Sequence, residues 1–182
     1  MMRIAYADPP YFGHGNLYTD TAVAAEREYD TIEAWERLAA QLSEYDGWAL
    51  SMTSGNLHDL LPLFTDQRPR IGAWTKPFAA YKRNVRVAYT WEPVLFVEAR
   101  KSSKTGAFVS RDFLAEPITM KKGLTGAKPE RFCRWVLDLV GWLPGDQVDD
   151  LFPGTGIMGR VVAAADASPE ILRDRSGWKE SA

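Results

Sequence analysis

Short apolar runs alternate with amphipathic stretches along this 182-residue chain, and the alternation predicts strands interleaved with helices. Candidate strands cover residues 3–7, 47–52, 71–76, 93–100 and 147–151. Candidate helices cover residues 30–42, 54–64, 129–140 and 157–167. This order of elements is typical of α/β proteins. We therefore expect about five mostly parallel strands in one sheet, with helices on both faces.

The first long helix has a recognisable start. Asp30 is expected to cap it, with Glu33 in the reciprocal capping position. The apolar positions that recur at helical spacing, and should face the sheet, are Ile32, Trp35, Leu38, Ala39 and Leu42. Residues 12–29, in front of this helix, have little periodicity. They are predicted to form a loop that could act as a lid.

The first strand runs directly into Asp8-Pro9-Pro10-Tyr11. The two prolines stop the strand and stiffen the turn, at the end of the strand where open α/β sheets bind their ligands. Such a turn suits methylation of an exocyclic amino group on a nucleobase. Asp8 and the Pro9 carbonyl can accept hydrogen bonds from the amino group, and Tyr11 can stack on a base turned out of its helix. The alternative is an ordinary Asp-Pro turn with an exposed tyrosine.

A second motif occupies residues 144–156, which read as a turn, a strand ending in acid and a glycine-rich loop entering a helix. Asp150 at the strand end can bind an ammonium or hydroxyl group, and Gly154 and Gly156 let the backbone approach a ligand closely. The alternative is a simple turn between strand and helix. Two such motifs at predicted strand ends make a ligand site the stronger interpretation.

Together the motifs resemble those of amino methyltransferases that use S-adenosylmethionine. Asp8-Pro9-Pro10-Tyr11 resembles their catalytic motif, and Val148-Asp149-Asp150-Leu151-Phe152-Pro153-Gly154-Thr155-Gly156 resembles their cofactor loop. Residues 126–130 resemble the Lys-Pro motif that precedes this loop, and residues 91–96 resemble an intervening strand. The catalytic motif comes first, which is the permuted order of β-class DNA methyltransferases and messenger-RNA adenine methyltransferases. The chain is similar to short forms from actinobacteria and their phages.

The resemblance implies a Rossmann-like methyltransferase fold, permuted and truncated, with S-adenosyl-L-methionine as the cofactor. It implies that the catalytic residues are Asp8, Pro9, Pro10 and Tyr11. It implies that the cofactor-binding residues are Ala7, Asp8, Lys128, Asp150, Leu151, Phe152, Pro153, Gly154, Thr155 and Gly156, with Lys128 near the cofactor carboxylate. Asp in the first motif position favours adenine N6 in DNA. A cytosine-N4 enzyme, an RNA adenine methyltransferase and a non-catalytic nucleic-acid-binding protein are the alternatives.

Charge is unevenly distributed along the chain. Residues 68–128 contain thirteen Lys or Arg and four Asp or Glu, a net charge of +9, whereas the remainder has nine basic and twenty acidic residues, a net charge of −11. A basic segment with interleaved aromatic residues favours a surface for nucleic acid, including single strands. The proposed contacts are Lys76, Lys82, Arg83, Arg86, Lys121 and Lys122. The alternative is a solvated charged loop.

The sequence departs from the family pattern after residue 167. No apolar strand follows, and residues 168–182 form a polar tail that lacks the acidic strand end expected to hold the cofactor ribose. The segment available for target recognition, residues 101–125, is also short. The strand at 147–151 should therefore lie at the sheet edge, beside the first strand and parallel to it. We expect the 12–29 loop, the tail around Trp178 or a second subunit to cover this edge.

Composition fits a single domain over residues 1–182. The chain has no apolar run long enough to span a membrane and no signal-peptide pattern, so a cytoplasmic protein is expected. The lone cysteine, Cys133, lies within a predicted helix and is expected to be a core residue rather than a nucleophile for cytosine C5. The two histidines, His14 and His58, provide no zinc cluster, so no metal is expected.

Overall fold

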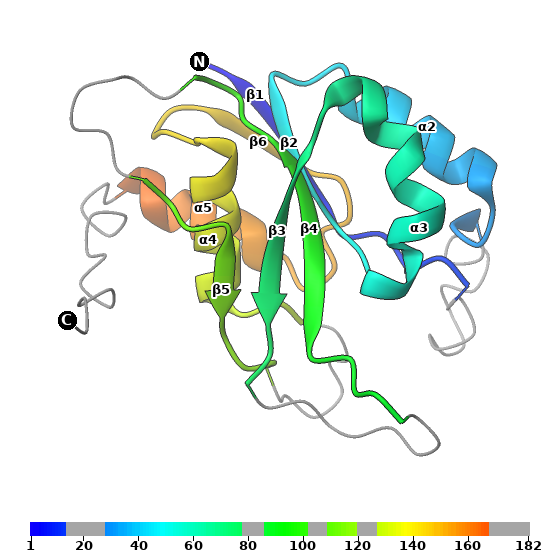
Figure 1. Ribbon diagram of the computed structural model, residues 1–182. Coiled ribbons are helices and arrows are strands. Elements are labelled where there is room, and N and C mark those ends of the chain that lie inside the picture. Colours follow the sequence, from blue (N-terminus) through cyan, green and yellow to red (C-terminus); the bar gives the residue numbers. More distant parts are fainter. Residues whose placement is uncertain (14–27, 78–85, 102–108, 120–126, 168–182) are drawn as a thin grey trace.

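The computed structural model describes residues 1–13, 28–77, 86–101, 109–119 and 127–167 (Figure 1). Its strands are β1 (Arg3–Ala7), β2 (Gly47–Ser51), β3 (Arg70–Thr75), β4 (Trp91–Val97), β5 (Phe113–Ala115) and β6 (Gln147–Asp150). Its helices are α2 (Ile32–Leu42), α3 (Leu57–Leu60), α4 (Glu130–Val140) and α5 (Ile157–Ala167), with 3-10 turns η2 (Ser54–Asn56) and η3 (Leu61–Gln67). None of the described helices has the length and apolar character needed to cross a membrane.

The strands form one sheet in the order β5-β3-β4-β2-β1-β6. β1 pairs in parallel with β2 and β6, and β3 pairs in parallel with β5. β4 is antiparallel to both of its neighbours, β2 and β3. The predicted α/β sheet is confirmed, including the parallel pairing of β1 with β6 and the position of β6 at an edge.

The sheet has one strand more than the sequence suggested. β5 lies within residues 101–125, the segment assigned to target recognition, and pairs with β3. Its three residues are too few for a detectable alternation of apolar and polar positions. The strand β4 also begins at Trp91 and ends at Val97, earlier at both ends than the apolar run implied.

Helices cover the two faces of the sheet, with α4 and α5 on one side and α2 and α3 on the other (Figure 1). Beneath α4, Phe132 and Val136 pack in one core cluster with Trp74 and Phe96. A second cluster, beneath α2, joins helix residues to β1, β2 and β4 and includes Trp35, Leu38, Trp48, Leu50 and Leu95. The sheet is therefore buried on both faces along its middle strands.

The helix α2 begins one residue later than the sequence suggested. Thr31 is its N-cap, and the Thr31 Oγ1 accepts a hydrogen bond from Ala34 N at 3.4 Å. Asp30 instead accepts a hydrogen bond from Gly13 N at 2.9 Å. This contact ties the turn after β1 to the start of α2, which fixes the direction in which the chain leaves the sheet.

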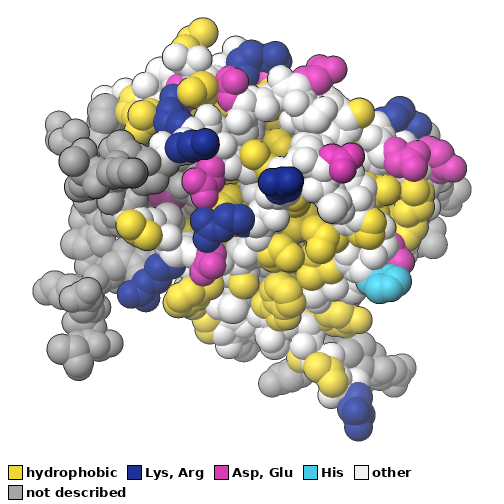
Figure 2. Space-filling model, turned by 45° about the horizontal axis from the view of Figure 1, so that its top comes forward, with side chains coloured by type: hydrophobic (Ala, Val, Ile, Leu, Met, Phe, Trp, Pro, Cys, Tyr) yellow, Lys and Arg dark blue, Asp and Glu magenta, His cyan; other side chains and the backbone are white. Residues whose placement is uncertain are grey.

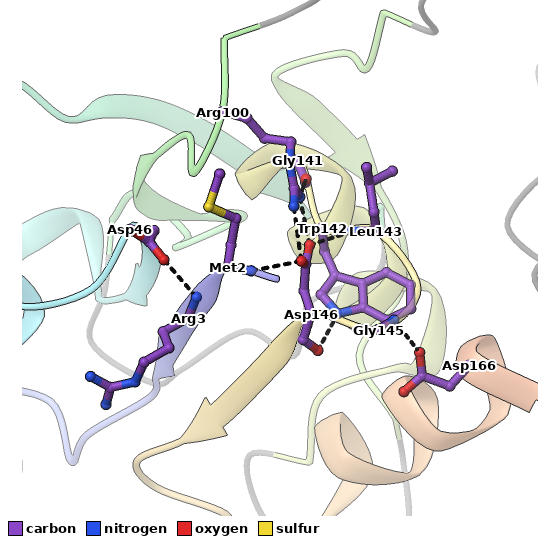
Figure 3. A network of polar contacts seen from close by, with 10 residues as sticks. All are labelled: Met2, Arg3, Asp46, Arg100, Gly141, Trp142, Leu143, Gly145, Asp146 and Asp166. Carbon is purple, nitrogen blue, oxygen red and sulfur yellow. Dashed lines mark hydrogen bonds and ion pairs between the residues drawn. The ribbon is translucent and has the colours of Figure 1, made fainter.

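At the amino end of β1 and β6, the carboxylate of Asp146 is surrounded by donors (Figure 3). Two Arg100 nitrogens donate to its oxygens at 2.5 and 2.8 Å. The backbone nitrogens of Met2 and Leu143 donate at 2.8 and 2.9 Å. Arg100 also donates to Gly141 O at 2.7 Å, so one network fastens the start of β1, the end of α4 and the segment after β4.

Candidate active site

Alternation along the strands gathers polar side chains at the opposite end of the sheet, on the face that α4 covers. On β1, Tyr6 lies in the core cluster beneath α4, and Asp8 follows it by two residues. On β6, Asp150 pairs with Tyr6, and on β4, Glu92 pairs with Trp74 of β3. Because β4 is antiparallel, its first residues lie at the edge where β1 and β3 end. Segments far apart in sequence therefore supply one site.

Lys128, which lies two residues before α4, is the centre of this cluster. Its Nζ is 2.9 Å from Asp8 Oδ1, 3.1 Å from the Tyr11 hydroxyl and 3.7 Å from Glu92 Oε2. The Tyr11 hydroxyl donates a hydrogen bond to Glu92 Oε2 at 3.0 Å. Lys128 is only 9% exposed. One buried ammonium group thus fixes the positions of a carboxylate and a tyrosine in the turn after β1.

A second lysine, Lys76, pairs with Glu92 Oε1. Its Nζ lies 4.6 Å from the ring centre of Trp74, and the Lys128 Nζ lies 5.7 Å from the same ring. Cations over an indole face are attracted by its quadrupole. The sequence assigned Lys76 to nucleic-acid contacts, but its side chain is 13% exposed and its charge is matched by Glu92. The structure places it within the buried cluster.

The charges of the cluster shift one another's pKa values. Burial raises the pKa of the Asp8 carboxyl above its usual value, although the Lys128 ammonium opposes the rise. Burial also acts on Glu92, but Lys128 and Lys76 outweigh it and lower the pKa of that carboxyl. For Lys128, burial is outweighed by Asp8 and its other neighbours, and the pKa lies well above its usual value. Asp8 is therefore the carboxylate of this cluster that gains a proton most readily.

Asp150, at the end of β6, has a different environment. Its Oδ1 is buried and has no hydrogen-bond partner among the described residues. Burial raises the pKa of this carboxyl, a backbone hydrogen bond from Phe152 lowers it, and the negative charge of Asp8 raises it. The loop that follows has positive φ at Gly154 and at Gly156, +44° and +68°, which L side chains rarely adopt. A buried carboxylate oxygen without a partner among the described residues, beside such a loop, is suited to an ammonium or hydroxyl group of a ligand.

The remaining predicted residues of the two motifs line the same end of the sheet. Ala7 is fully buried in the cluster beneath α2. Pro9 is buried and Pro10 is half-buried, as expected of a stiff turn. Leu151 and Phe152 are half-buried and pack against the cluster beneath α2. Pro153 is exposed and Thr155 is half-buried.

Most of the predicted nucleic-acid contacts lie outside the described residues. These are Lys82, Arg83, Lys121 and Lys122; the greater part of the candidate lid, residues 14–27, and the tail, residues 168–182, lie outside as well. Arg86 is described and exposed. Cys133 is fully buried in α4, and burial raises the pKa of its thiol to about 12, which confirms that it is a core residue. The described residues include no group of three His, Cys, Asp or Glu that could hold a metal ion.

Sequence reasoning missed Glu92 as a site residue. The signal was available, because Glu92 is an acidic residue inside the run Trp91-Glu92-Pro93-Val94-Leu95-Phe96, where a solvated charge is out of place. Its partners are remote in sequence: Tyr11 is 81 positions away and Lys76 is 16 positions away. Only the register of the sheet brings these three residues together.

Comparison with known proteins gives structural matches only. No family model matches the sequence, and no curated protein matches it. Among solved structures, the chain is similar to the PvuII DNA methyltransferase (cytosine-N4-specific), with 15% identity and a TM-score of 0.60 over 90% of this chain and 71% of that chain.

Two further structures match over a similar share of the chain. The complex of M1.HpyAVI with SAM has 14% identity and a TM-score of 0.59, covering 90% of this chain and 78% of that chain. A proposed DNA modification methylase from Thermus thermophilus, complexed with S-adenosyl-L-methionine, has 14% identity and a TM-score of 0.50, covering 89% and 76%. The chain therefore has the Rossmann-like fold of these methyltransferases.

Proposed function

We propose that this protein transfers a methyl group from S-adenosyl-L-methionine to an exocyclic amino group of a nucleobase, adenine N6 in DNA. One observation carries the proposal. Two acids, Asp8 and Asp150, end adjacent parallel strands on the same face of the sheet; Lys128 holds the first, and the second keeps an oxygen without a partner among the described residues. Similar folds occur in DNA methyltransferases and in complexes with this cofactor, which supports the same assignment.

The residues at the end of β6 fit the methionine end of the cofactor. The buried, unpartnered Oδ1 of Asp150 would accept a hydrogen bond from the cofactor ammonium, which would offset the cost of burying that carboxylate. The exposed Gly154 and its neighbours would present backbone to the ligand. Lys128 was expected near the cofactor carboxylate, and its Nζ is already engaged by Asp8 and Tyr11. We assign Lys128 mainly to the catalytic turn.

The chemistry requires an activated amine, because the lone pair of an exocyclic amino group is delocalised into the ring. When bound, the cofactor supplies a methyl group on a positively charged sulfur. Asp8 and the Pro9 carbonyl accept hydrogen bonds from the amino group and localise its lone pair. On receiving the methyl group the nitrogen would become cationic, and the Asp8 carboxylate would stabilise that charge and accept the released proton.

Tyr11 is assigned to the target base. Its hydroxyl is held from both sides, donating to Glu92 and accepting from Lys128. A ring anchored in this way has lost its rotamer freedom before the base arrives, so stacking costs less entropy. Glu92 and Lys76 act through these contacts as positioning residues.

The nature of the amino group is the finer part of the proposal. The cytosine-N4 specificity of the structurally similar PvuII enzyme favours cytosine N4 as the second candidate. Against a purely binding function, Asp8 adds negative charge where a phosphate backbone would approach, which weakens binding unless the carboxylate has a chemical role.

The test has two stages. Titration calorimetry with S-adenosyl-L-methionine measures cofactor binding directly. Mass spectrometry of nucleosides from DNA and RNA co-expressed with the protein then identifies the product. N6-methyladenine in DNA is the expected product. Detection of N4-methylcytosine instead would change the assigned target base to cytosine. Methylated adenine found only in RNA would change the assigned substrate from DNA to RNA. Absence of cofactor binding by the folded protein would overturn the proposal.

A further inference from the structure

Among the described residues, no helix lies over the second face of the sheet at β3 and β5. In β3, Ile71, Ala73 and Thr75 point away from α4, since Gly72 and Trp74 between them face it. Ile71 is 41% exposed. The described helices α2 and α3 cover the middle strands of this face rather than β3 and β5 (Figure 1). Figure 2 shows hydrophobic side chains gathered between the strands β3 and β5 and the helix α3.

Aromatic rings lie on this open face. Trp91 of β4 pairs with Thr75, and Phe113 of β5 pairs with Ala73, so both rings point to the same side as Ile71. Trp91 is 36% exposed and Phe113 is 42% exposed.

The aromatic surface extends beyond the start of β4. Lys76 N donates to Thr90 O at 2.7 Å, so the ladder between β3 and β4 continues past Trp91. Tyr89, the next residue on the same side, is 57% exposed. Three exposed aromatic residues, Tyr89, Trp91 and Phe113, therefore form what we call the aromatic face.

A cation lies beside the aromatic face, and the acids of the surrounding basic segment already have cationic partners. The acids of the basic segment are already paired, Glu92 with Lys76, Glu98 and Asp112 with Arg70, and Glu116 with Arg131. In contrast, Arg86 is exposed and forms no ion pair within the described part of the chain. Arg111 lies 5.9 Å from the ring centre of Phe113. Aromatic rings on a rigid sheet beside cations are a known platform for unpaired bases.

The aromatic face also adjoins the candidate active site. Trp91 directly precedes Glu92, and successive residues of a strand point to opposite faces. The ring of Trp91 is thus on one side of the sheet, while the next side chain holds Tyr11 on the other. A nucleic-acid strand that passes the edge of the sheet at the start of β4 can therefore reach both the aromatic face and the candidate active site.

We propose that Tyr89, Trp91 and Phe113 stack on the bases of a single-stranded nucleic acid whose neighbouring base enters the site at Asp8. This inference rests on the proposed function in taking a nucleobase as the substrate. A second copy of the chain is the less suitable occupant. A symmetric contact through this face would bring the two copies of Arg111, each beside Phe113, toward each other.

The experiment measures binding of a fluorescein-labelled 12-nucleotide single strand and of its hairpin duplex by anisotropy. The variants are Trp91→Ala and Phe113→Ala, with Trp91→Phe to restore a ring. Leu143→Ala is the matched control, because Leu143 is 54% exposed and lies near Asp146 at the other end of the sheet. Each lost ring should weaken single-strand binding by about 5- to 100-fold. The wild type should prefer the single strand, Trp91→Phe should recover most of the affinity, and Leu143→Ala should match the wild type.

Calorimetry with S-adenosyl-L-methionine on the same samples separates this inference from the proposed function. Intact cofactor binding with unchanged single-strand affinity in Trp91→Ala and Phe113→Ala would overturn the aromatic face alone. Absent cofactor binding with the expected losses of affinity would overturn the proposed function and leave the aromatic face supported. Sedimentation is the third readout. A wild-type dimer that dissociates in Trp91→Ala while oligonucleotide affinity stays constant would assign the face to self-association instead.

Discussion

Buried carboxylates lie at both ends of the sheet, and they differ in how their charges are matched. At the amino end, the Asp146 carboxylate receives four hydrogen bonds, two from Arg100 and one each from the backbone of Met2 and Leu143. These donors hold the pKa of Asp146 at about 2, below its usual value. A carboxylate so fully satisfied has no capacity left for a ligand, and its effect is to fasten chain segments together.

At the carboxyl end, Glu92 is matched by Lys76 and Lys128, whereas Asp8 and Asp150 are less fully compensated. Burial raises the pKa values of Asp8 and Asp150, and an oxygen of Asp150 has no partner among the described residues. Burying a charge without full compensation destabilises the fold, so such an arrangement is a cost that a ligand can relieve. The contrast teaches that the donors around a carboxylate separate Asp146, which fastens chain segments together, from Asp150, which keeps an oxygen for a ligand.

The largest expected effect comes from removing the carboxylate of the turn after β1. Asp8→Ala should lower methyl transfer by about 10²- to 10⁴-fold, because the amino group loses its hydrogen-bond acceptor and proton acceptor. Stability should fall as well, because the buried Lys128 loses its 2.9 Å ion pair, although Glu92 and Tyr11 still contact its ammonium group. Activity is measured by methyl incorporation and folding by circular dichroism. Near-normal activity would remove Asp8 from the mechanism.

Activity should also fall as the pH decreases through the pKa of Asp8, because the protonated carboxyl no longer accepts a proton. Burial raises the pKa of Asp8 above the usual value for an aspartate, about 3.9. The fall in activity on the acid side of the pH profile, its acid limb, should therefore lie above that pH. Rates measured between about pH 4 and 8 give the pH at which activity falls on the acid side. A limb that persists unchanged in the residual activity of Asp8→Ala would assign it to another group.

The next largest effect concerns stability at the amino end. Asp146→Asn should lower the free energy of unfolding by roughly 2–4 kcal/mol, because Arg100 and two backbone donors lose a buried charged acceptor. In the wild type, about 2 kcal/mol of stability should be present above pH 4 and be lost as the pH falls toward about 2, since the folded pKa is depressed. Urea unfolding at several pH values measures both effects. Asp149→Asn is the control, because its partly exposed pair with Arg3 should contribute little.

A smaller effect is expected from Glu92→Gln, which keeps the shape of the side chain and removes its charge. Tyr11 loses a charged acceptor, so kcat should fall by about 10-fold. The negative charge of Glu92 raises the pKa of Asp8, so its removal should move the acid limb to lower pH. A purely structural role would lower stability and leave the pH profile in place. That result would contradict positioning by Glu92.

The smallest effect concerns the basic segment. Charge reversal at Lys82 and Arg83 should weaken nucleic-acid binding and reduce the slope of log K against log salt by about 1.4 for a single strand, or about 1.8 for duplex. Arg37→Glu, on the exposed side of α2, is the control. Affinities from 50 to 200 mM salt, an approximate window in which the electrostatic term is large, provide the slope. An unchanged slope would identify these residues as a solvated surface.

Sequence reasoning predicted the strands that carry the two motifs because each motif is local. Asp8 and Asp150 follow apolar runs directly, and the prolines and glycines next to them mark the ends of those runs. The adjacency of β1 and β6 was also predictable, since a catalytic turn and a cofactor loop must face one ligand.

What the sequence did not reveal depends on register between distant segments. Glu92 enters the site because β4 is antiparallel, and nothing in its own neighbourhood specifies that direction. The pairing of Lys76 with Glu92 was not predicted either, because it is set by the ladder between β3 and β4. The cap of α2 was misplaced by one residue because Asp30 and Thr31 are both good caps, and Asp30 is used by Gly13 instead.

The most direct test compares Asp150→Asn with Asp146→Asn by two measurements on each protein, cofactor affinity by calorimetry and the free energy of unfolding by urea. Asp150→Asn should weaken binding of S-adenosyl-L-methionine by about 10-fold or more while stability stays equal or rises, because a buried charge is removed. Asp146→Asn should lose stability and retain the wild-type affinity while folded. Loss of stability in Asp150→Asn with unchanged cofactor affinity would contradict the assignment of the two ends of the sheet.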